Sequence, residues 1–129
     1  MAEATSRIQR YLEDELGECR NEDLQQRLDE LDELDALVDE GTRSTDVGTL
    51  AALGNETRYR LVRLLVEADS ELCVCELTPL MDVSDSAVSH ALAKLVETGL
   101  VTKRKDGRWR KYRATPRASA LLIALDGTR

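Results

Sequence analysis

Apolar residues recur every three or four positions through residues 1–41, which predicts amphipathic helices. Ile8, Leu12, Leu16 and Cys19 form one apolar stripe, and a second stripe runs through residues 24–38. On one straight helix the two stripes would be offset by about 90–120°. We therefore predict a break near Gly17–Asn21, where Cys19 lies. The stripes are expected to pack on the rest of the chain or on a second subunit.

Beyond residue 41 the pattern predicts five further helices and one β-hairpin. The helices are expected over residues 47–54, 56–69, 71–81 and 85–98, and after Pro116. Asn55, Ser70 and Ser84 are the predicted N-caps. Asp106-Gly107 joins two β-like runs, which is a hairpin signal.

The order of these elements predicts the fold class, which is mainly α with a β-hairpin. Helix, helix, helix–turn–helix, β-hairpin and helix is the layout of a winged helix-turn-helix domain. We predict an acidic helical arm over residues 1–41, used for dimerisation or sensing. Residues 42–129 are predicted to form the DNA-binding domain, with the polar stretch Gly41–Thr45 at the boundary.

Charge divides the chain in the same place. The net charge is −7, yet residues 1–41 hold 14 acidic and 4 basic side chains, whereas residues 83–117 hold 3 acidic and 9 basic ones. Overall acidity therefore does not exclude DNA as a partner. The excess of acids, with 14 Arg against 4 Lys and no Phe, favours a halophile's cytosolic protein over an ordinary acidic one.

Length and composition exclude several classes of protein. A chain of 129 residues is too short for a (β/α)8 barrel, which needs about 250. It has no run of 18 apolar residues, and its N-terminus lacks the apolar core of a signal peptide, so we expect a cytoplasmic protein without a membrane span. One His, no paired carboxylates near it and no Gly-rich phosphate loop make an enzyme the least favoured class.

The predicted hairpin is strongly basic. Seven bases lie within residues 103–113, beside the single acid Asp106. They are Lys103, Arg104, Lys105, Arg108, Arg110, Lys111 and Arg113. Like charges at this density repel unless a polyanion compensates them, so we interpret the hairpin as a wing that contacts the DNA backbone or minor groove. The alternative is a solvated hairpin whose charge protects a sheet edge.

The helix predicted over residues 85–98 carries polar positions that can share one outward face. These positions are Ser86, Ser89, His90 and Lys94, and Ser84 at the N-cap completes the predicted DNA-reading set. Small hydroxyls and an imidazole can reach base edges in a major groove. For His90, the one His of the chain, a plain surface role and a metal-ligand role remain open.

A third candidate functional feature, after the basic hairpin and the polar helix face, is the motif Cys73-Val74-Cys75. Three cysteines are too few for a disulfide framework. On a regular helix these two residues lie about 200° apart, so binding one ion requires the helix start to loosen. Pro79 permits this, because it has no N–H to bond the carbonyl of Cys75. We also expect the helix dipole to favour thiolates at this position.

An ion on Cys73 and Cys75 would distort the helix that braces the reading helix, which predicts a switch. Cys19 is the remaining cysteine. A three-sulfur site of Cys19, Cys73 and Cys75 would suit As(III) or Sb(III), with Cd(II) or Pb(II) next and Zn(II) also to be tested. The spacing alone equally allows small buried apolar residues.

Residues 47–117 resemble the ArsR/SmtB family of metal-responsive winged-helix repressors. The resemblance lies in ALGNETRYRLVRLL, ELCVCEL and VSDSAVSHALAKLVETGLVTKRKDGRWRKYRA. It implies a homodimer that represses by binding double-stranded operator DNA and is released by a metal or metalloid ion.

The resemblance also implies ligands. Cys73 and Cys75 match the family's thiolate ligands, whereas Thr78 stands where arsenite sensors can have a third Cys. In cadmium- or lead-sensing members the arm supplies further thiolates, a role that Cys19 would take, from either chain. The family's zinc- or nickel-type site on the last helix is not expected, because that helix has no His.

Two other functions remain open at this point. Cys19 could pair with Cys73 or Cys75 in a thiol redox sensor, since a disulfide within C-x-C closes a small, strained ring. The chain could also be a DNA-binding or interaction module that senses nothing.

Overall fold

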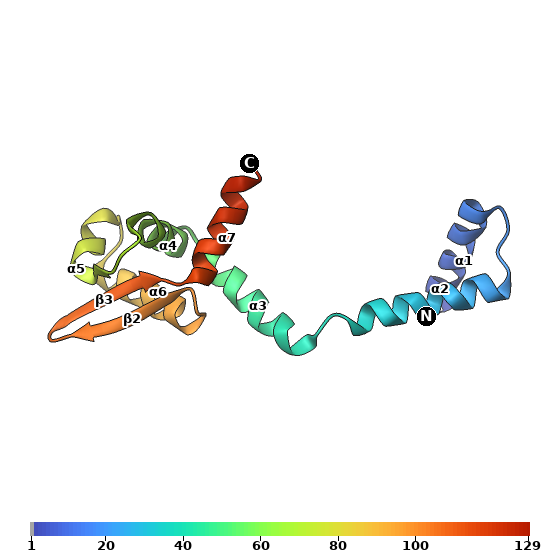
Figure 1. Cartoon of the computed structure of the whole chain (residues 1–129), viewed down its shortest axis with the longest axis horizontal. Coiled ribbons are helices and arrows are strands. Elements are labelled where there is room, and N and C mark those ends of the chain that lie inside the picture. Colours follow the sequence, from blue (N-terminus) through green and yellow to red (C-terminus); the bar gives the residue numbers. More distant parts are fainter. Residues whose placement is uncertain (1) are drawn as a thin grey trace. The chain divides into compact units, whose positions relative to one another are not determined.

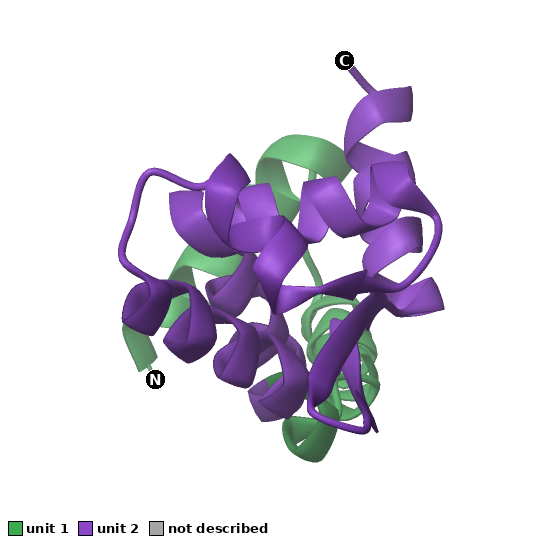
Figure 2. Ribbon diagram, turned by 90° about the vertical axis from the view of Figure 1, so that its left-hand side faces the viewer, with its two compact units in different colours: residues 1–43 green, residues 44–129 purple. Residues whose placement is uncertain are grey.

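The computed structural model describes residues 2–129 and divides them into unit 1, residues 1–43, and unit 2, residues 44–129 (Figure 2). The helices are α1 (Ala2–Leu16), α2 (Asn21–Ala36), α3 (Glu40–Leu53), α4 (Glu56–Ala68), α5 (Val74–Leu77), α6 (Asp85–Glu97) and α7 (Pro116–Gly127), with a 3-10 turn, η1 (Thr78–Leu80). The strands are β1 (Leu72–Cys73), β2 (Val101–Asp106) and β3 (Trp109–Ala114).

Unit 1 contains the predicted break. Helix α1 ends at Leu16, and Gly17 takes a φ of +83°, a left-handed value that favours glycine. Helix α2 begins at Asn21 and contacts α1. Leu12 is buried, whereas most other apolar side chains of the two helices are partly or fully exposed. This unit therefore has two helices but almost no core of its own.

Helix α3 is longer than the predicted helix over residues 47–54. It begins at Glu40 and runs through the predicted boundary at residues 41–42. The division between the units falls inside this helix. The sequence pattern missed its first turns because they carry no apolar stripe.

The core of unit 2 forms where α4 and α6 pack together. Leu61 and Leu65 of α4 and Leu92 and Leu95 of α6 are essentially inaccessible to solvent, as their spacing predicted. The predicted caps are also present. Asn55 Oδ1 accepts from the N–H of Arg58 at 3.1 Å, and Ser84 Oγ accepts from the N–H of Ala87 at 3.1 Å.

The predicted helix over residues 71–81 is wrong in its first and last turns. Leu72 and Cys73 form β1, which pairs antiparallel with β3, and only Val74–Leu77 is α-helical before η1. The backbone of Leu72 and Cys73 is extended to pair with β3, so the helix begins only after Cys73. Pro79 then has no N–H to extend the helical bonding. Cys73, not Ser70, is the N-cap of α5.

The three strands lie in the order β1-β3-β2 and complete a winged helix-turn-helix. The hairpin of β2 and β3 extends past the helices of its unit (Figure 1). Its turn places Gly107 at a φ of +62°, first of the two turn residues, where a tight hairpin accepts glycine. Helix α7 follows as predicted, with Pro116 in its first turn after the N-cap Thr115.

Candidate DNA interface and thiol site

Helix α6 presents the predicted reading residues on one side. Val88, Leu92 and Leu95 of this helix are buried in the core, whereas the predicted polar residues are exposed: Ser86, Ser89, His90 and Lys94, with Ser84 at the N-cap. Lys94 lies 3.8 Å from Glu97 in a weak surface pair. The spacing therefore predicted the exposed face of α6, and contact with DNA stays a prediction.

One face of the wing is basic without compensating acids. Residues paired across an antiparallel ladder share a face. Lys105 pairs with Arg110, and Lys103 pairs with the buried Tyr112 near the base. Across residues 2–129, Lys103, Lys105 and Arg110 form no ion pair. These three side chains are free to meet a polyanion.

The opposite face of the wing is compensated. Arg104 binds Glu71 with both Nε and Nη2 at 2.9 Å, and Lys111 Nζ lies 3.1 Å from an oxygen of Asp106. Arg104 holds the pKa of Glu71 below its usual value, and Lys111, then Arg104, does the same for the pKa of Asp106. Sequence reasoning counted Arg104 and Lys111 with the free bases and missed Glu71.

The turn of the wing carries a second residue that the sequence reasoning missed. The guanidinium of Arg108 lies 4.9 Å from the ring centroid of Trp109, which is a cation–π contact. The Trp109 side chain is large, apolar and exposed. Its position in a β-like run next to Arg108 was the available signal. The pair adds a flat surface to the basic tip of the wing.

The two thiols of the C-x-C motif lie in contact. Cys73 Sγ accepts from Cys75 Sγ at 2.7 Å and from the N–H of Cys75 at 3.3 Å. This is possible because Cys73 is an extended N-cap residue and Cys75 lies in the first turn of α5. The predicted loosening at the start of this helix is thus built into the fold. Cys73 is buried and Cys75 is exposed.

The expected effect of the helix start on the thiols is wrong for Cys75. Its pKa lies above the ordinary value, first because of the hydrogen bond with Cys73. Burial raises the pKa further, as do the charges of Cys73 and Glu76. A helix of four residues brings too little dipole to outweigh these neighbours. Any ion that binds both sulfurs must displace protons, so its affinity depends on pH.

A groove of about 400 Å³ joins Cys75 to helix α6. Its lining comes from the segment of α5 and η1 and from α6: Val74, Cys75, Thr78, Pro79, Asp85 and Ser89. Thr78 donates from Oγ1 to the carbonyl of Val74 at 2.9 Å. The exposed thiol and Ser89 therefore border one depression.

Cys19 lies in unit 1, between α1 and α2. Its side chain is half-buried, and its Sγ donates to the carbonyl of Arg20 at 3.6 Å. Burial raises the pKa of Cys19, and Asp23 and Glu13 add to the rise. Over residues 2–129, no three His, Cys, Asp or Glu side chains gather closely enough to hold an ion. Cys19 as a third ligand stays a prediction.

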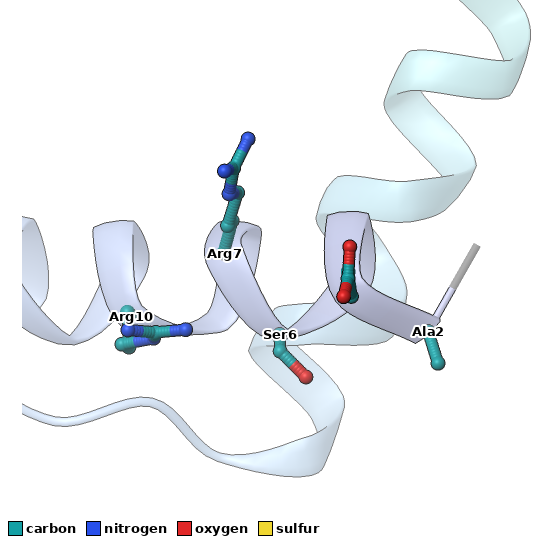
Figure 3. A pocket seen from close by; sticks show the side chains of 5 residues that line it. Ala2, Ser6, Arg7 and Arg10 are labelled. Carbon is teal, nitrogen blue, oxygen red and sulfur yellow. The ribbon is translucent and has the colours of Figure 1, made fainter.

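A larger hollow, of about 410 Å³, lies along the first turns of α1 (Figure 3). Its labelled lining residues are Ala2, Ser6, Arg7 and Arg10, and Arg7 and Ser6 point in opposite directions. Its lining contains no thiol.

No helix in residues 2–129 is both long and apolar enough to cross a membrane.

Comparisons with known proteins agree with this geometry. The family model described as bacterial regulatory protein, arsR family, matches residues 55–103, which run from the N-cap of α4 into β2. A Halobacterium salinarum protein that carries the name arsenical resistance operon repressor ArsR is 60% identical over 126 residues, 98% of each chain. Its source agrees with the prediction of a halophile.

Solved structures show the same fold. HlyU from Vibrio cholerae N16961 is 32% identical, with a TM-score of 0.61 over 69% of this chain and 96% of that one. The homodimeric winged helix-turn-helix DNA-binding domain of a Mycobacterium bovis protein is 25% identical, with a TM-score of 0.58 over 67% and 79%. This chain belongs to the ArsR family of transcriptional repressors, which are DNA-binding regulators and not enzymes.

Proposed function

We propose that this chain is a homodimeric, cytoplasmic repressor that a thiophilic ion releases from operator DNA by binding Cys73 and Cys75. The observation that carries the proposal is the contact of the two sulfurs at 2.7 Å, beside a groove that α6 also lines. An ion at this place lies next to the helix that reads DNA. Its binding energy can therefore bias that helix between two arrangements.

Soft thiolate ligands favour soft, thiophilic ions, which makes As(III) and Sb(III) the first candidates for the inducer. Cd(II) and Pb(II) come next, and Zn(II) is the last ion to be tested. We propose Cys19, from the same chain or the partner, as the third sulfur. Two protein thiolates leave such an ion undercoordinated, and Cys19 is the remaining cysteine of the chain.

In the proposed complex with DNA, α6 lies in the major groove. Ser84, Ser86, Ser89, His90 and Lys94 would contact base edges or nearby phosphates, and Lys103, Lys105 and Arg110 would contact the backbone. Arg108 at the turn would contact the backbone as well, whereas Arg104 and Lys111 contribute less charge because acids compensate them. In concentrated salt, close contacts of this kind matter more than long-range attraction.

The dimer is proposed to form through α3 and α7, with the arm as a further contribution. Val47 and Leu50 of α3 and Ile123 and Leu125 of α7 are each about half or more exposed. Large apolar side chains gathered on two helices of one unit are typical of an interface. Sedimentation equilibrium should give a dimer, and Ile123→Glu should shift it toward the monomer. A monomeric wild type would contradict this part of the proposal.

The main experiment is a titration of the reduced protein with As(III), Cd(II), Pb(II) and Zn(II). Thiolate-to-metal charge-transfer absorbance reports binding, and fluorescence anisotropy of a labelled duplex reports release of DNA. The duplex is selected by the ion-free protein from a random-sequence pool. Cys73→Ser tests the pair, and Cys19→Ser tests the third ligand. If DNA affinity stays unchanged with every ion, the proposal of sensing is wrong.

The contact of the two sulfurs also bears on a thiol redox sensor as the second candidate. After mild peroxide, mass spectrometry would show a loss of two hydrogens that a reductant restores. If Cys19→Ser or Cys75→Ser abolishes that loss, and peroxide releases DNA when the ions do not, the redox function is favoured. A module that senses nothing would respond to neither treatment.

A further inference from the structure

The strand that holds Cys73 also belongs to the sheet of the wing. Strand β1 pairs with β3, and Cys73 is in register with Lys111. On the other side of β3, Lys111 is in register with Arg104 of β2. The buried thiol therefore lies on the strand next to β3 of the wing, and β3 lies between it and Arg104 on β2. A change at Cys73 has a short path into the element that contacts DNA.

Glu71 ties the start of β1 directly to the wing. It lies two residues before Cys73, and both of its oxygens bind the guanidinium of Arg104. Its side chain is 29% exposed, so it is partly sheltered from solvent. A bidentate carboxylate–guanidinium pair fixes direction as well as distance. The position of β1 thus sets where Arg104 points.

An ion must change the other end of β1. An ion that binds both sulfurs displaces the thiol proton that Cys75 Sγ donates to Cys73 Sγ. The ion also competes for the lone pairs of Cys73 Sγ, which accept from the N–H of Cys75. Because Cys73 is buried and paired in the ladder, its side chain has little freedom, and the backbone between β1 and α5 must adjust.

We propose that Glu71 is a positioning residue that couples ion binding at Cys73 and Cys75 to the wing through its ion pair with Arg104. The inference rests on the proposed function, because it describes how the signal of that site travels. An adjustment of β1 moves the Glu71 carboxylate, and the bidentate pair carries the movement to β2. The wing then presents its free basic face to DNA at a different angle.

The test measures a ratio, namely the dissociation constant of the duplex with sodium arsenite divided by that without it. In Glu71→Gln the pair with Arg104 is weakened while the shape is kept. We expect the ratio to fall about tenfold below the wild-type ratio, because typical coupling between sites is 5–150-fold. Asp106→Asn is the matched control. It removes a carboxylate from the same face of the wing, one that pairs with Lys111 at 3.1 Å and lies 3.9 Å from Arg104 but makes no ion pair with β1.

Both variants lose one negative charge near the wing, so both should bind DNA somewhat more tightly without an ion. Only Glu71→Gln should lose the response to arsenite. Arg104→Gln breaks the link from the other end and should lose the response to the same extent, with no further loss in the double variant. This second variant keeps the test valid if Glu71→Gln folds poorly.

A measurement without DNA completes the design. The NMR signal of the Arg104 Nε–H reports its bond to Glu71. It should shift when arsenite is added to the wild type and stay fixed in Cys73→Ser. If Glu71→Gln keeps the wild-type ratio, or if the signal does not shift, the inference is wrong while the proposed function stands. If the wild type itself does not respond to arsenite, Cd(II), Pb(II) or Zn(II), both are wrong.

Discussion

Unit 1 and unit 2 use similar residues in opposite ways. Unit 1 has apolar stripes, yet Leu12 is its one buried apolar side chain in residues 2–43, and Leu37 is 80% exposed. Unit 2 buries Leu61, Leu65 and Leu92 completely. Residues 1–41 carry 14 acids and 4 bases, whereas residues 42–129 carry 11 acids and 14 bases. One unit has a core and a basic surface, and the other has neither.

This difference shows what an apolar stripe does and does not specify. A helical period predicts a helix, but a fold also needs a surface that covers the apolar side. In unit 2 the other elements of the same unit supply that surface. In unit 1 the side chains of Leu34, Leu37 and Val38 stay exposed, so their packing partner is not part of the unit.

The largest expected effect comes from replacing one leucine by alanine in each unit and comparing the two losses of stability. Leu92→Ala should lower the free energy of unfolding by about 2–5 kcal/mol, because it leaves a cavity in a closed core. Leu37→Ala should change it by less than about 0.5 kcal/mol, as exposed positions do. Denaturant unfolding followed by circular dichroism, which reports the helices of both units, measures both. An equal loss of unfolding free energy in Leu37→Ala would mean that another surface packs over Leu37 in solution.

The second prediction compares the thiols of the two units. Cys73→Ser should abolish the release of DNA by arsenite, because it removes a thiolate ligand while the serine hydroxyl can still accept at the N-cap of α5. The expected loss is the whole wild-type response, on the order of 5–150-fold in DNA affinity. Cys19→Ser should weaken ion binding and retain part of the release. Anisotropy titrations with and without arsenite measure both variants.

The outcome for Cys19→Ser decides how far the units cooperate. Equal affinity for arsenite in the wild type and in Cys19→Ser would remove unit 1 from the ion site. Circular dichroism of each variant without an ion is the control for folding. A wild-type response in Cys73→Ser would contradict the assignment of the pair.

Much of unit 2 could be predicted from the sequence, because its signals are local. Asn55, Ser84 and Gly107 act within a few residues of themselves, and each has the predicted role of cap or turn. The segment around Cys73 could not be predicted in the same way. Its apolar pattern fits a helix, but the pairing of β1 depends on β3, about forty residues later in the chain. Local patterns do not report such contacts.

The candidate site shows the same limit. Counting bases located the wing, because charge is a property of the sequence itself. The division of those bases into a free face and a compensated face depends on Glu71, which is 33 residues away from Arg104. The contact of the two thiols likewise follows from the extended backbone of Cys73.

A third prediction tests the two faces of the wing. Each phosphate contact that is lost reduces the slope of log affinity against log salt by about 1. Lys105→Gln should show this reduction, because its charge is free. Lys111→Gln should show a smaller reduction, because Asp106 already compensates Lys111. Equal reductions for both would mean that the ion pair opens when DNA binds.

The smallest expected effect concerns the acid stability of unit 2. Arg63 binds both oxygens of Asp126, at 2.8 and 3.0 Å, which ties α4 to α7. Arg63 holds the pKa of Asp126 below its ordinary value. A carboxyl group with a lowered pKa stabilises the fold above its unfolded pKa, and this stability is lost as the pH falls through the folded value.

Asp126→Asn should therefore lower the unfolding midpoint at pH 7, and the difference from the wild type should shrink below about pH 4. Both side chains are partly exposed, so solvent screens the pair and the shift should be small. Glu30→Gln in unit 1 is the control, because Glu30 pairs with Arg27 on the same helix and ties no two elements together. Thermal unfolding followed by circular dichroism at several pH values should show no pH-dependent difference for this control. If Asp126→Asn behaves like the control, the pair of Arg63 and Asp126 does not hold α7 on α4.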